Sequence, residues 1–218
     1  MESFATGKID AMTMTNGDTL VTGATGVKGV MVMLTDYSNG NDMIIGRPGV
    51  RTIKDLKGKK VAVEFGLVEH LLLLNGLKKA GMKESDVTLV NAKTNEMPQV
   101  LAVNPTSLAA RRADWQKVVG VWDKVVSFIN DPKTQPEALK IMAARVGVKP
   151  EAYAQFLKGT RLLSLKEGQA IMVKGEGFKS LYGSTKIADE FNVANDVYKT
   201  PQAIDSYIDP SLTNAAVK

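Results

Sequence analysis

The sequence predicts an α/β fold that ends in a helical block. Segment 51–81 has the pattern of a short helix, a strand, a glycine turn and a longer helix in direct succession. Short apolar segments typical of strands occur at 9–14, 27–34 and 87–90. Beyond Ser107 the apolar residues recur at helical spacing instead. Strands linked by helices, followed by helices alone, indicate an α/β fold with parallel strands.

The N-terminal part is predicted to begin with two strands. Residues 1–7 have the pattern of the tail of a helix that stops at a glycine, and a strand is expected at 9–14. Residues 15–18 form a turn whose side chains can cap a short helix at 19–24. Segment 27–34 is apolar enough for a strand that is buried on both faces.

A polar loop is expected at 35–40, followed by a third strand at 42–46. The strongest local pattern comes next. A short helix at 52–56 stops at Gly58, and Val61 and Val63 alternate as in a strand over 60–64. A helix then follows up to Gly81, so the strand turns through Gly66 into a helix start with free backbone N–H groups.

Helices dominate the remainder of the prediction. After the strand at 87–90, residues 95–102 are expected to be helical, and Pro105 then breaks the pattern. Amphipathic patterns predict further helices, which are weaker toward the C-terminus: 114–129, 136–146, 150–158, 165–173, 177–191 and 201–207. The two tryptophans and the methionines are interpreted as core residues.

Composition and charge exclude several classes of function. With 218 residues, 44% hydrophobic and 23% charged, the chain can bury a core in one or two domains. The net charge is +5, but no basic run is interleaved with aromatic residues, so nucleic-acid binding is not expected. No apolar run reaches the length of a membrane span, and residues 1–4 do not look like a signal peptide.

The counts of cysteine and histidine restrict the chemistry further. The chain has no cysteine, which excludes thiol catalysis, thiolate metal sites and disulfides but does not decide the compartment. A single histidine, His70, excludes a multi-histidine metal site within one chain. We therefore expect no metal and no cofactor.

Several segments together resemble a known family. Residues 4–11, FATGKIDA, resemble its signature L-A-S-G-K-hydrophobic-D-A, and residues 53–63, IKDLKGKKVAV, are similar to its segment D-L-K-G-K-K-V-A-V. Gly66 with 70–73, HLLL, resembles the family's turn into a helix of the second lobe. AARVGV at 143–148 and LYGS at 181–184 add to the match. The family is that of the substrate-binding proteins of nitrate, sulfonate and taurine type ABC importers, with the related thiamine-pyrimidine precursor proteins.

This resemblance implies a type II periplasmic-binding-protein fold of two lobes that close by a hinge motion on a small solute. Lobe I would contain residues 1–40, lobe II 41–102, and 103–218 would return to lobe I and add the C-terminal helices. Compared with the family pattern, a signal peptide and a first strand–helix unit are absent before Met1, and a block is missing where Ala102 meets Val103. The fold would thus be incomplete. The implied partners are a small-molecule solute and an ABC permease in the membrane, and the implied location of the full-length protein is periplasmic, or extracytoplasmic with a lipid anchor.

Carried over by position, the resemblance places the solute contacts in three loops. The implied ligand-binding residues are Thr15, Asn16, Gly17 and Asp18, then Asp36, Ser38 and Asn39, then Gly66, Leu67, Val68, Glu69 and His70. Asn16 and Asp18 can alternatively serve as helix caps, and 38–40 as a plain turn. The acidic residues argue against a cleft for anions alone, so an amine or amide solute competes with a sulfonate, taurine or nitrate. His70 at a helix start is expected to stay neutral.

Two alternatives to an importer component remain open. The first is a thiamine-pyrimidine-precursor or sensory binding domain on the same fold, and a related possibility is a shortened chain that no longer binds. The second is an enzyme in which carboxylates and His70 perform acid–base chemistry. The sequence has no nucleophile elbow, P-loop, zinc motif or GxGxxG, and the glycine-rich segment 23–29 lacks P-loop spacing. We therefore predict a binding protein and not an enzyme.

Overall fold

The computed structural model describes residues 2–65, 68–91 and 100–217. Its strands are β1 (Ala11–Met14), β2 (Val30–Leu34), β3 (Asp36–Ser38), β4 (Lys60–Val63), β5 (Thr88–Asn91), β6 (Val100–Val103) and β7 (Thr160–Leu162). Its α-helices are α1 (Glu2–Ala5), α2 (Asn16–Ala24), α3 (Val68–Lys79), α4 (Pro105–Ala110), α5 (Arg112–Asn130), α6 (Gln135–Val146), α7 (Pro150–Lys158), α8 (Leu165–Ile171), α9 (Leu181–Ala194) and α10 (Ser211–Ala216). Short 3₁₀ turns lie at Ile53–Leu56, Glu84–Asp86, Gly177–Lys179 and Ile204–Ser206.

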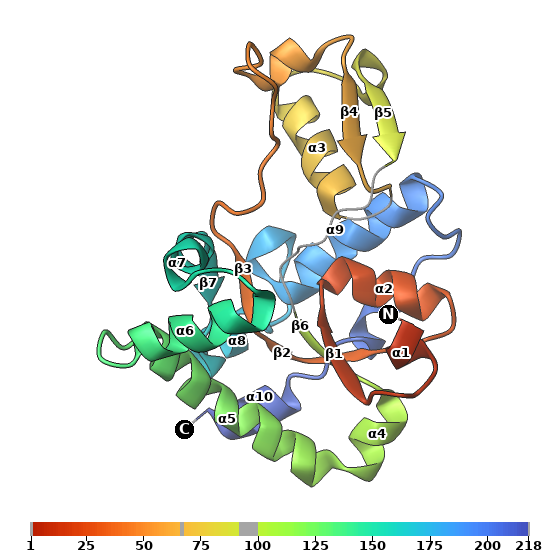
Figure 1. Cartoon of the computed structure of the whole chain (residues 1–218). Helices are drawn as coiled ribbons and strands as arrows, with labels where there is room; N and C mark the ends of the chain where they lie inside the picture. Colours follow the sequence, from red (N-terminus) through yellow and green to blue (C-terminus); the bar gives the residue numbers. More distant parts are fainter. Residues whose placement is uncertain (1, 66–67, 92–99, 218) are drawn as a thin grey trace.

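A three-stranded sheet in the order β1-β6-β2 forms the centre of the larger region (Figure 1). Both outer strands run antiparallel to β6, with Ala11 and Val30 each opposite Val103. The chain also passes along the free edge of β2 at residues 207–209. There the Met31 N–H donates to the Tyr207 carbonyl at 2.7 Å, and the Asp209 N–H donates to the Met31 carbonyl at 2.9 Å. Residues from both ends of the chain therefore complete one sheet.

Strand β2 is buried on both faces, as its apolar sequence predicts. Met31 and Leu34 pack into a cluster with Leu20, Tyr207 and other residues of the α2 and α9 side. Val32 and Met33 pack into a second cluster, which includes residues of α5, α8 and α10. A β-bulge between Met31 and Met33 shifts the register against β6 and distributes these side chains between the two clusters.

The second region, here called the β4–α3 region, comprises residues 50–91 and lies at the top of Figure 1. Strands β4 and β5 pair in parallel, and α3 connects them. The region buries a core of its own, made of Leu56, Val63, Leu73, Leu77 and Val87. Because α3 covers one face only, alternate residues on the other face are exposed: Lys60, Ala62, Thr88 and Val90.

A two-stranded antiparallel ribbon, here called the β3–β7 ribbon, lies beside the central sheet. Its register places Asp36 opposite Leu162, Tyr37 opposite Arg161 and Ser38 opposite Thr160. From β3 the chain rises through residues 39–49 into the β4–α3 region (Figure 1). The ribbon thus lies directly before the segment that connects the two regions.

Several predictions from the sequence are confirmed. The strand and helix of segment 51–81 appear as β4 and α3, and Gly58 and Gly81 both adopt φ +73°, the left-handed conformation in which glycine ends a helix at little cost. The strands expected at 9–14 and 87–90 correspond to β1 and β5. The helices expected at 114–129, 136–146, 150–158 and 165–173 correspond to α5, α6, α7 and α8.

Other predictions are wrong, and each error involves a contact between distant residues. Residues 42–46 form no strand, whereas β3 lies inside the expected loop because β7, more than a hundred residues later, pairs with it. Residues 100–102 belong to β6 and not to a helix, since β1 and β2 both pair there; the earlier part of that prediction, 95–99, lies outside the described residues. The pairs of strands in the central sheet are antiparallel, whereas β4 and β5 pair in parallel.

Three predicted boundaries also change. The strand expected from residue 27 begins at Val30. The helix expected at 177–191 divides into a 3₁₀ turn and α9, separated at Ser180, which has extended backbone angles. The helix expected at 201–207 is reduced to the 3₁₀ turn Ile204–Ser206, because residues 207–209 extend along β2.

Candidate functional site

An open cleft with a volume of about 2000 Å³ separates the β4–α3 region from the β3–β7 ribbon and helices α6 and α7. One wall is formed by residues 41–50, β4 and α3, and the opposite wall by α6 and α7. The ribbon contributes Asp36, Ser38, Thr160 and Leu162. Of the residues predicted to bind ligand, the structure brings Asp36, Ser38 and Glu69 together in this cleft.

Alternation along the ribbon determines which of its side chains reach the cleft. Asp36 and Ser38 lie two residues apart in β3, and Thr160 and Leu162 lie two apart in β7, so all four occupy one face. Burial raises the pKa of the Asp36 carboxyl; a hydrogen bond from Thr35 opposes this rise, and the nearby Asp42 carboxylate adds to it. The cleft therefore contains a half-buried carboxyl group that burial and a neighbouring carboxylate both favour in its neutral form.

The loop after β3 is fixed by hydrogen bonds to β7 and α7. Asn39 donates its backbone N–H to the Gly159 carbonyl at 2.7 Å, and Ser38 Oγ accepts from the Asp42 N–H at 2.8 Å. Asn41 Nδ2 donates to Thr160 Oγ1 at 2.8 Å and to the Phe156 carbonyl at 2.9 Å. A Cβ at Gly159 would stand 2.0 Å from Asn41 Oδ1, so only glycine allows this close approach.

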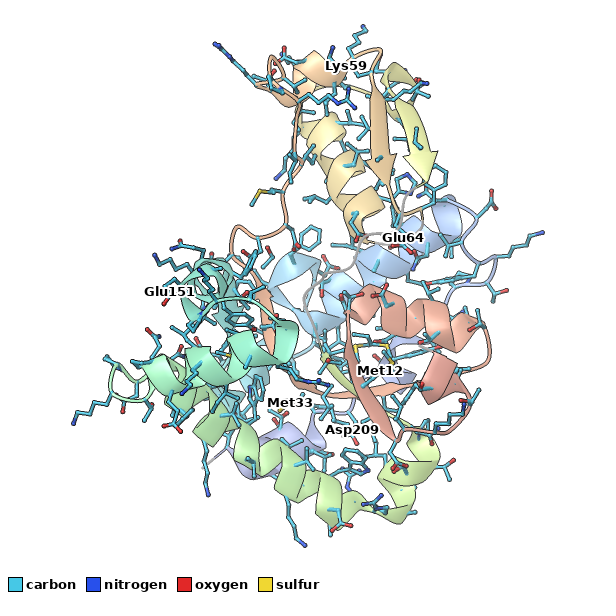
Figure 2. All side chains as sticks on the ribbon, in the orientation of Figure 1. Met12, Met33, Lys59, Glu64, Glu151 and Asp209 are labelled. Atoms are coloured by element: carbon cyan, nitrogen blue, oxygen red, sulfur yellow. The ribbon has the colours of Figure 1, made fainter. Side chains whose placement is uncertain are left out.

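The first predicted loop lies at the start of α2, and its residues are not among those that line the cleft. Thr15 caps this helix, with its Oγ1 accepting from the Asp18 N–H at 2.8 Å. Asp18 is 8% exposed, and burial raises the pKa of its carboxyl. Hydrogen bonds from Thr15 oppose the rise, whereas the carboxylates of Glu69 and Glu64 increase it. The negative charge of the β4–α3 region therefore makes ionisation of Asp18 on α2 less favourable. Glu64 lies at the lower end of that region in Figure 2.

Asn16 and Gly17 contribute to helix packing in this structure. Asn16 Nδ2 donates to Ser184 Oγ and to Thr185 Oγ1, each at 3.1 Å, and so joins α2 to α9. A Cβ at Gly17 would lie 3.6 Å from the Cβ of Ala188, an ordinary contact distance. The amide donor of Asn16 is therefore engaged within the protein.

His70 belongs to α3 and packs between two aromatic rings, one of which comes from α9. It is 6% exposed, and its ring centroid lies 5.5 Å from that of Phe65 and 5.3 Å from that of Phe191. Its Nε2 is 3.8 Å from Glu84 Oε1. Val68 begins α3, and Gly66 and Leu67 lie outside the described residues. The structure thus places His70 at the contact between the two regions.

Reasoning from the sequence missed several cleft residues. Asn41 and Thr160 reach the site only because β3 pairs with β7, and neither belongs to a recognisable motif. The amphipathic pattern at 150–158 predicts only a helix, yet Tyr153 and Phe156 of this helix, α7, line the cleft. Phe156 is 53% exposed, and this exposure could not be distinguished from core packing by helical spacing alone.

Two further searches were restricted to the described part of the chain. Within it, no group of three or more histidine, cysteine, aspartate or glutamate side chains is placed to hold a metal ion. No helix in the same ranges is both long enough and apolar enough to cross a membrane.

Comparison with known proteins supports the resemblance found in the sequence. Residues 43–105 match the family described as NMT1/THI5 like. A protein named as a binding protein in Brucella abortus is 32% identical over 92 residues, which are 42% of this chain and 25% of the relative. Equivalent proteins of Brucella suis and Brucella melitensis match equally well. The chain therefore spans about a quarter of the length of these curated relatives.

Solved structures match over almost the whole chain. The periplasmic aliphatic sulphonate binding protein SsuA of Escherichia coli gives a TM-score of 0.70 at 17% identity, covering 96% of this chain and 78% of that one. The alkanesulfonate-binding protein SsuA of Xanthomonas axonopodis pv. citri, bound to MOPS, gives 0.68 at 14% identity, covering 96% and 83%. The desulfurization enzyme DszB, in complex with biphenyl-2-sulfinic acid, gives 0.61 at 13% identity, covering 98% and 87%. The chain has the type II periplasmic-binding-protein fold that the sequence resemblance implied.

Proposed function

We propose that this chain acts as the solute-binding component of an ABC importer, which captures a small polar solute between two lobes and delivers it to a membrane permease. The observation that carries the proposal is the open cleft between two regions that bury separate cores. Clefts between domains are the usual position of small-molecule sites. The fold shared with sulfonate-binding proteins supports the same function.

The lobe boundaries expected from the sequence are part of this proposal. Lobe I would contain residues 1–40 and 103–218, and lobe II residues 41–102. The separate core of the β4–α3 region supports the assignment of lobe II, and the sheet shared by β1, β2 and β6 supports that of lobe I. Closure would then be a hinge motion across the connecting segments.

The solute contacts are proposed on the same basis. Asp36, Ser38 and Glu69 are favoured because they line the cleft. Thr15, Asn16, Gly17, Asp18, Asn39, Gly66, Val68 and His70 remain predicted contacts that lobe closure would have to bring to the solute. Substitution of Asp36 or Ser38 should then weaken binding before substitution of Asn16 does, because the amide of Asn16 already bonds to α9.

The cellular setting is proposed together with the function. Two of the similar structures are described as periplasmic, which supports an extracytoplasmic location for the full-length protein, either free in the periplasm or lipid-anchored. The proposed partners are the small-molecule solute and an ABC permease. Neither nucleic acid nor a cofactor has a role in this proposal.

A thermal-shift screen tests the proposal directly. Purified protein would be melted with taurine, alkanesulfonates, nitrate, pyrimidines, amides and small amines. A ligand at about a hundred times its Kd should add roughly 2.7 kcal/mol to the free energy of unfolding, since it binds only the native state. A cooperative melt that no solute class shifts would contradict solute binding by this chain.

A second candidate is a pyrimidine-precursor-binding domain, which the match of residues 43–105 to the NMT1/THI5 like family favours. It predicts a thermal shift with aminopyrimidines alone and no stimulation of a reconstituted importer. An enzyme on this fold is represented by DszB. We propose that the present chain is not an enzyme, and it has no cysteine to supply a thiolate nucleophile. Release of sulfite from aryl sulfinates by the purified chain would overturn this view.

A further inference from the structure

The β3–β7 ribbon separates positive from negative charge between its two faces. Tyr37 and Arg161 are directly opposite each other in the register, so their side chains share one face. Asp36 and Ser38 lie on the other face with Thr160, and this second face lines the cleft. The cation of the ribbon and the carboxylate of the ribbon therefore point in opposite directions.

Arg161 is held firmly on the face away from the cleft. Its Nη2 donates to Glu167 Oε1 at 2.8 Å, and its guanidinium lies 5.3 Å from the centroid of the Tyr37 ring while hydrogen-bonding to the Tyr37 hydroxyl. The same Glu167 carboxylate accepts from Ser164, and these donors lower the pKa of Glu167 to about 2. Arg161 is thus neutralised by a carboxylate other than Asp36.

Asp36 itself has no basic partner in the described ranges. Among residues 2–65, 68–91 and 100–217, no lysine, arginine or histidine side chain forms an ion pair with it, and Thr35 is its hydrogen-bonding neighbour. The nearby amide of Asn41 directs its N–H groups to Thr160 and to the Phe156 carbonyl, and not to the carboxylate. Asp36 therefore presents a half-buried carboxyl group to the cleft. A cation bound in the cleft could form an ion pair with this group.

Apolar and aromatic side chains also line the cleft. Tyr153 and Phe156 of α7 are among them, with Leu162 and Val146. Four basic residues line the cleft: Arg47, Lys59, Lys60 and Lys79. Lys60 begins β4 and Lys79 ends α3, and both of these ends lie far from the ribbon in Figure 1, near Lys59 in Figure 2. A cleft lined by both a carboxyl group and aromatic rings suits organic cations, which the rings attract through their negative faces.

We propose that the cleft binds an organic ammonium ion with an apolar body, whose charged head pairs with Asp36 and whose body lies against Tyr153 and Phe156. This inference rests on the proposed solute-binding function and narrows its solutes, which include anions, amides and amines, to amines alone. It differs from the sulfonates named for the structurally similar proteins. An anionic head at the same place would meet Asp36 and Asp42 at close range.

Three probes with the same body and different heads test the sign of the charge. Isothermal titration calorimetry would compare 2-phenylethylamine, 2-phenylethanol and 2-phenylethanesulfonate on the wild-type chain. We expect the amine to bind at least tenfold more tightly than the alcohol, because a charge-assisted hydrogen bond is stronger than a neutral one. Tighter binding of the sulfonate than of the amine would overturn the inference.

Variants locate the effect at Asp36. Asp36→Asn should weaken amine binding roughly tenfold or more and leave alcohol binding unchanged, whereas Asp36→Glu should retain most of the amine affinity. Glu190→Gln removes the same charge from an exposed site on α9 and should change nothing. A cooperative melt of each variant confirms folding. Unchanged amine affinity in Asp36→Asn would overturn the inference.

The outcomes also separate this inference from the function on which it rests. If none of the three probes binds but another solute class shifts the melting temperature, the binding function stands and the ammonium assignment falls. If no solute of any class binds to a folded chain, both fall together. Amine binding that Asp36→Asn weakens and Asp36→Glu preserves supports both.

Discussion

The cores of the β4–α3 region and of the central-sheet region differ in how far apart in sequence their contacting residues lie. In the β4–α3 region every core residue comes from the single stretch between Leu56 and Val87. The central sheet combines β1 and β2 with β6, and residues 207–209 extend along β2. Local contacts require little loop closure, whereas distant contacts must first offset its entropy. The same kind of destabilising substitution should therefore affect stability differently in the two regions.

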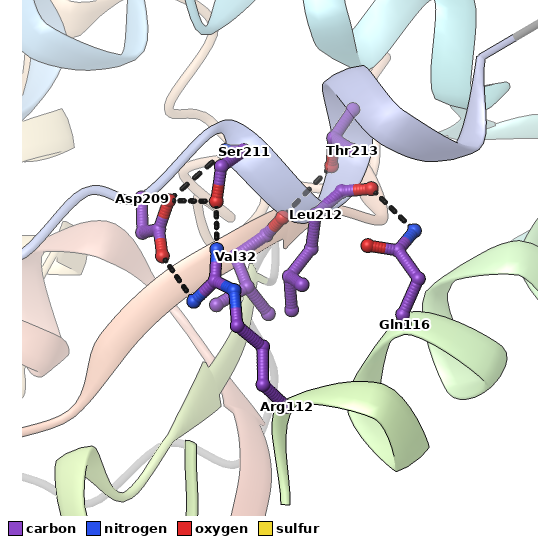
Figure 3. A network of polar contacts seen from close by, with 7 residues as sticks. All are labelled: Val32, Arg112, Gln116, Asp209, Ser211, Leu212 and Thr213. Carbon is purple, nitrogen blue, oxygen red and sulfur yellow. Dashed lines mark hydrogen bonds and ion pairs between the residues drawn. The ribbon is translucent and has the colours of Figure 1, made fainter. Parts of the chain in front are cut away.

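The C-terminal segment shows how the distant contacts are held (Figure 3). Thr213 Oγ1 donates to the Val32 carbonyl at 2.8 Å, and Gln116 Nε2 donates to the Leu212 carbonyl at 2.9 Å. Arg112 at the start of α5 forms an ion pair with Asp209 at 3.2 Å and contacts Ser211. Helix α10 is thereby attached both to the sheet and to α5, so residues near the C-terminus stabilise a strand near the N-terminus.

The largest expected effect comes from truncating one core leucine in each region. Leu212 and Leu77 are each 1% exposed, and Leu→Ala at such positions costs about 2–5 kcal/mol. Leu212→Ala should lower the main thermal transition, since α10 anchors the sheet. Leu77→Ala should instead expose the amides of β4 and α3 to hydrogen exchange while β1, β2 and β6 stay protected. Equal loss of protection everywhere in both variants would show that the two regions unfold as one unit.

A matched pair of helix glycines gives a smaller effect in the same comparison. A Cβ at Gly23 of α2 would lie 2.0 Å from the hydroxyl and 2.5 Å from a ring carbon of Tyr207, which is buried. Gly23→Ala should therefore displace the segment beside β2 and cost about 1–3 kcal/mol, measured by urea denaturation.

Gly76 of α3 provides the control for this substitution. The nearest atom to a Cβ there would be Ile44 Cδ1 at 3.4 Å, at the far end of a flexible side chain. Gly76→Ala should cost little and can gain up to about 1 kcal/mol, because alanine favours a helix over glycine. If Gly76→Ala proved as damaging as Gly23→Ala, the distant contact to Tyr207 would not be the cause.

The same difference in range explains what the sequence could predict. Lys60–Val63 and Val68–Lys79 were identified correctly because their apolar spacing and the glycines at their ends act within a few residues. Asp36–Ser38 and Thr160–Leu162 are three residues each, too short to carry a periodic pattern, and they form only as a pair. Val100–Val103 became a strand because two distant partners bond to it.

The candidate site follows the same rule. The family resemblance led to Asp36, Ser38 and Glu69, which line the cleft, but could not indicate Thr160 or Asn41, which arrive by pairing and by loop contacts. It also named Asn16, whose amide bonds to α9 in this structure. A polar residue in a turn has the same sequence signal whether it caps a helix, joins two helices or meets a solute.

The next expected effect, also small, concerns the charge between the two regions. The pKa of Asp18 is raised by burial and by Glu69 and Glu64 of the β4–α3 region, so the folded state holds this proton more tightly than the unfolded state. Stability from Asp18 is then fully present below its unfolded pKa and is lost as pH rises through its folded pKa. Asp18→Asn keeps an oxygen acceptor for Thr15 without the charge, and should stabilise the protein by about 1 kcal/mol at pH 7. In thermal melts this gain should vanish toward pH 4.

Glu167 provides the opposite sign within the central region. Arg161 and Ser164 lower its pKa to about 2, so its stabilising effect is present above the unfolded value of 4.5 and is lost as pH falls toward 2. Glu167→Gln should reduce stability at neutral pH, by less than about 1 kcal/mol because the pair is partly exposed to solvent. The two variants should therefore shift the melting temperature at pH 7 in opposite directions. A loss of stability in Asp18→Asn that persists at every pH would mean that Asp18 acts mainly as a cap of α2, and that repulsion between the two regions contributes little.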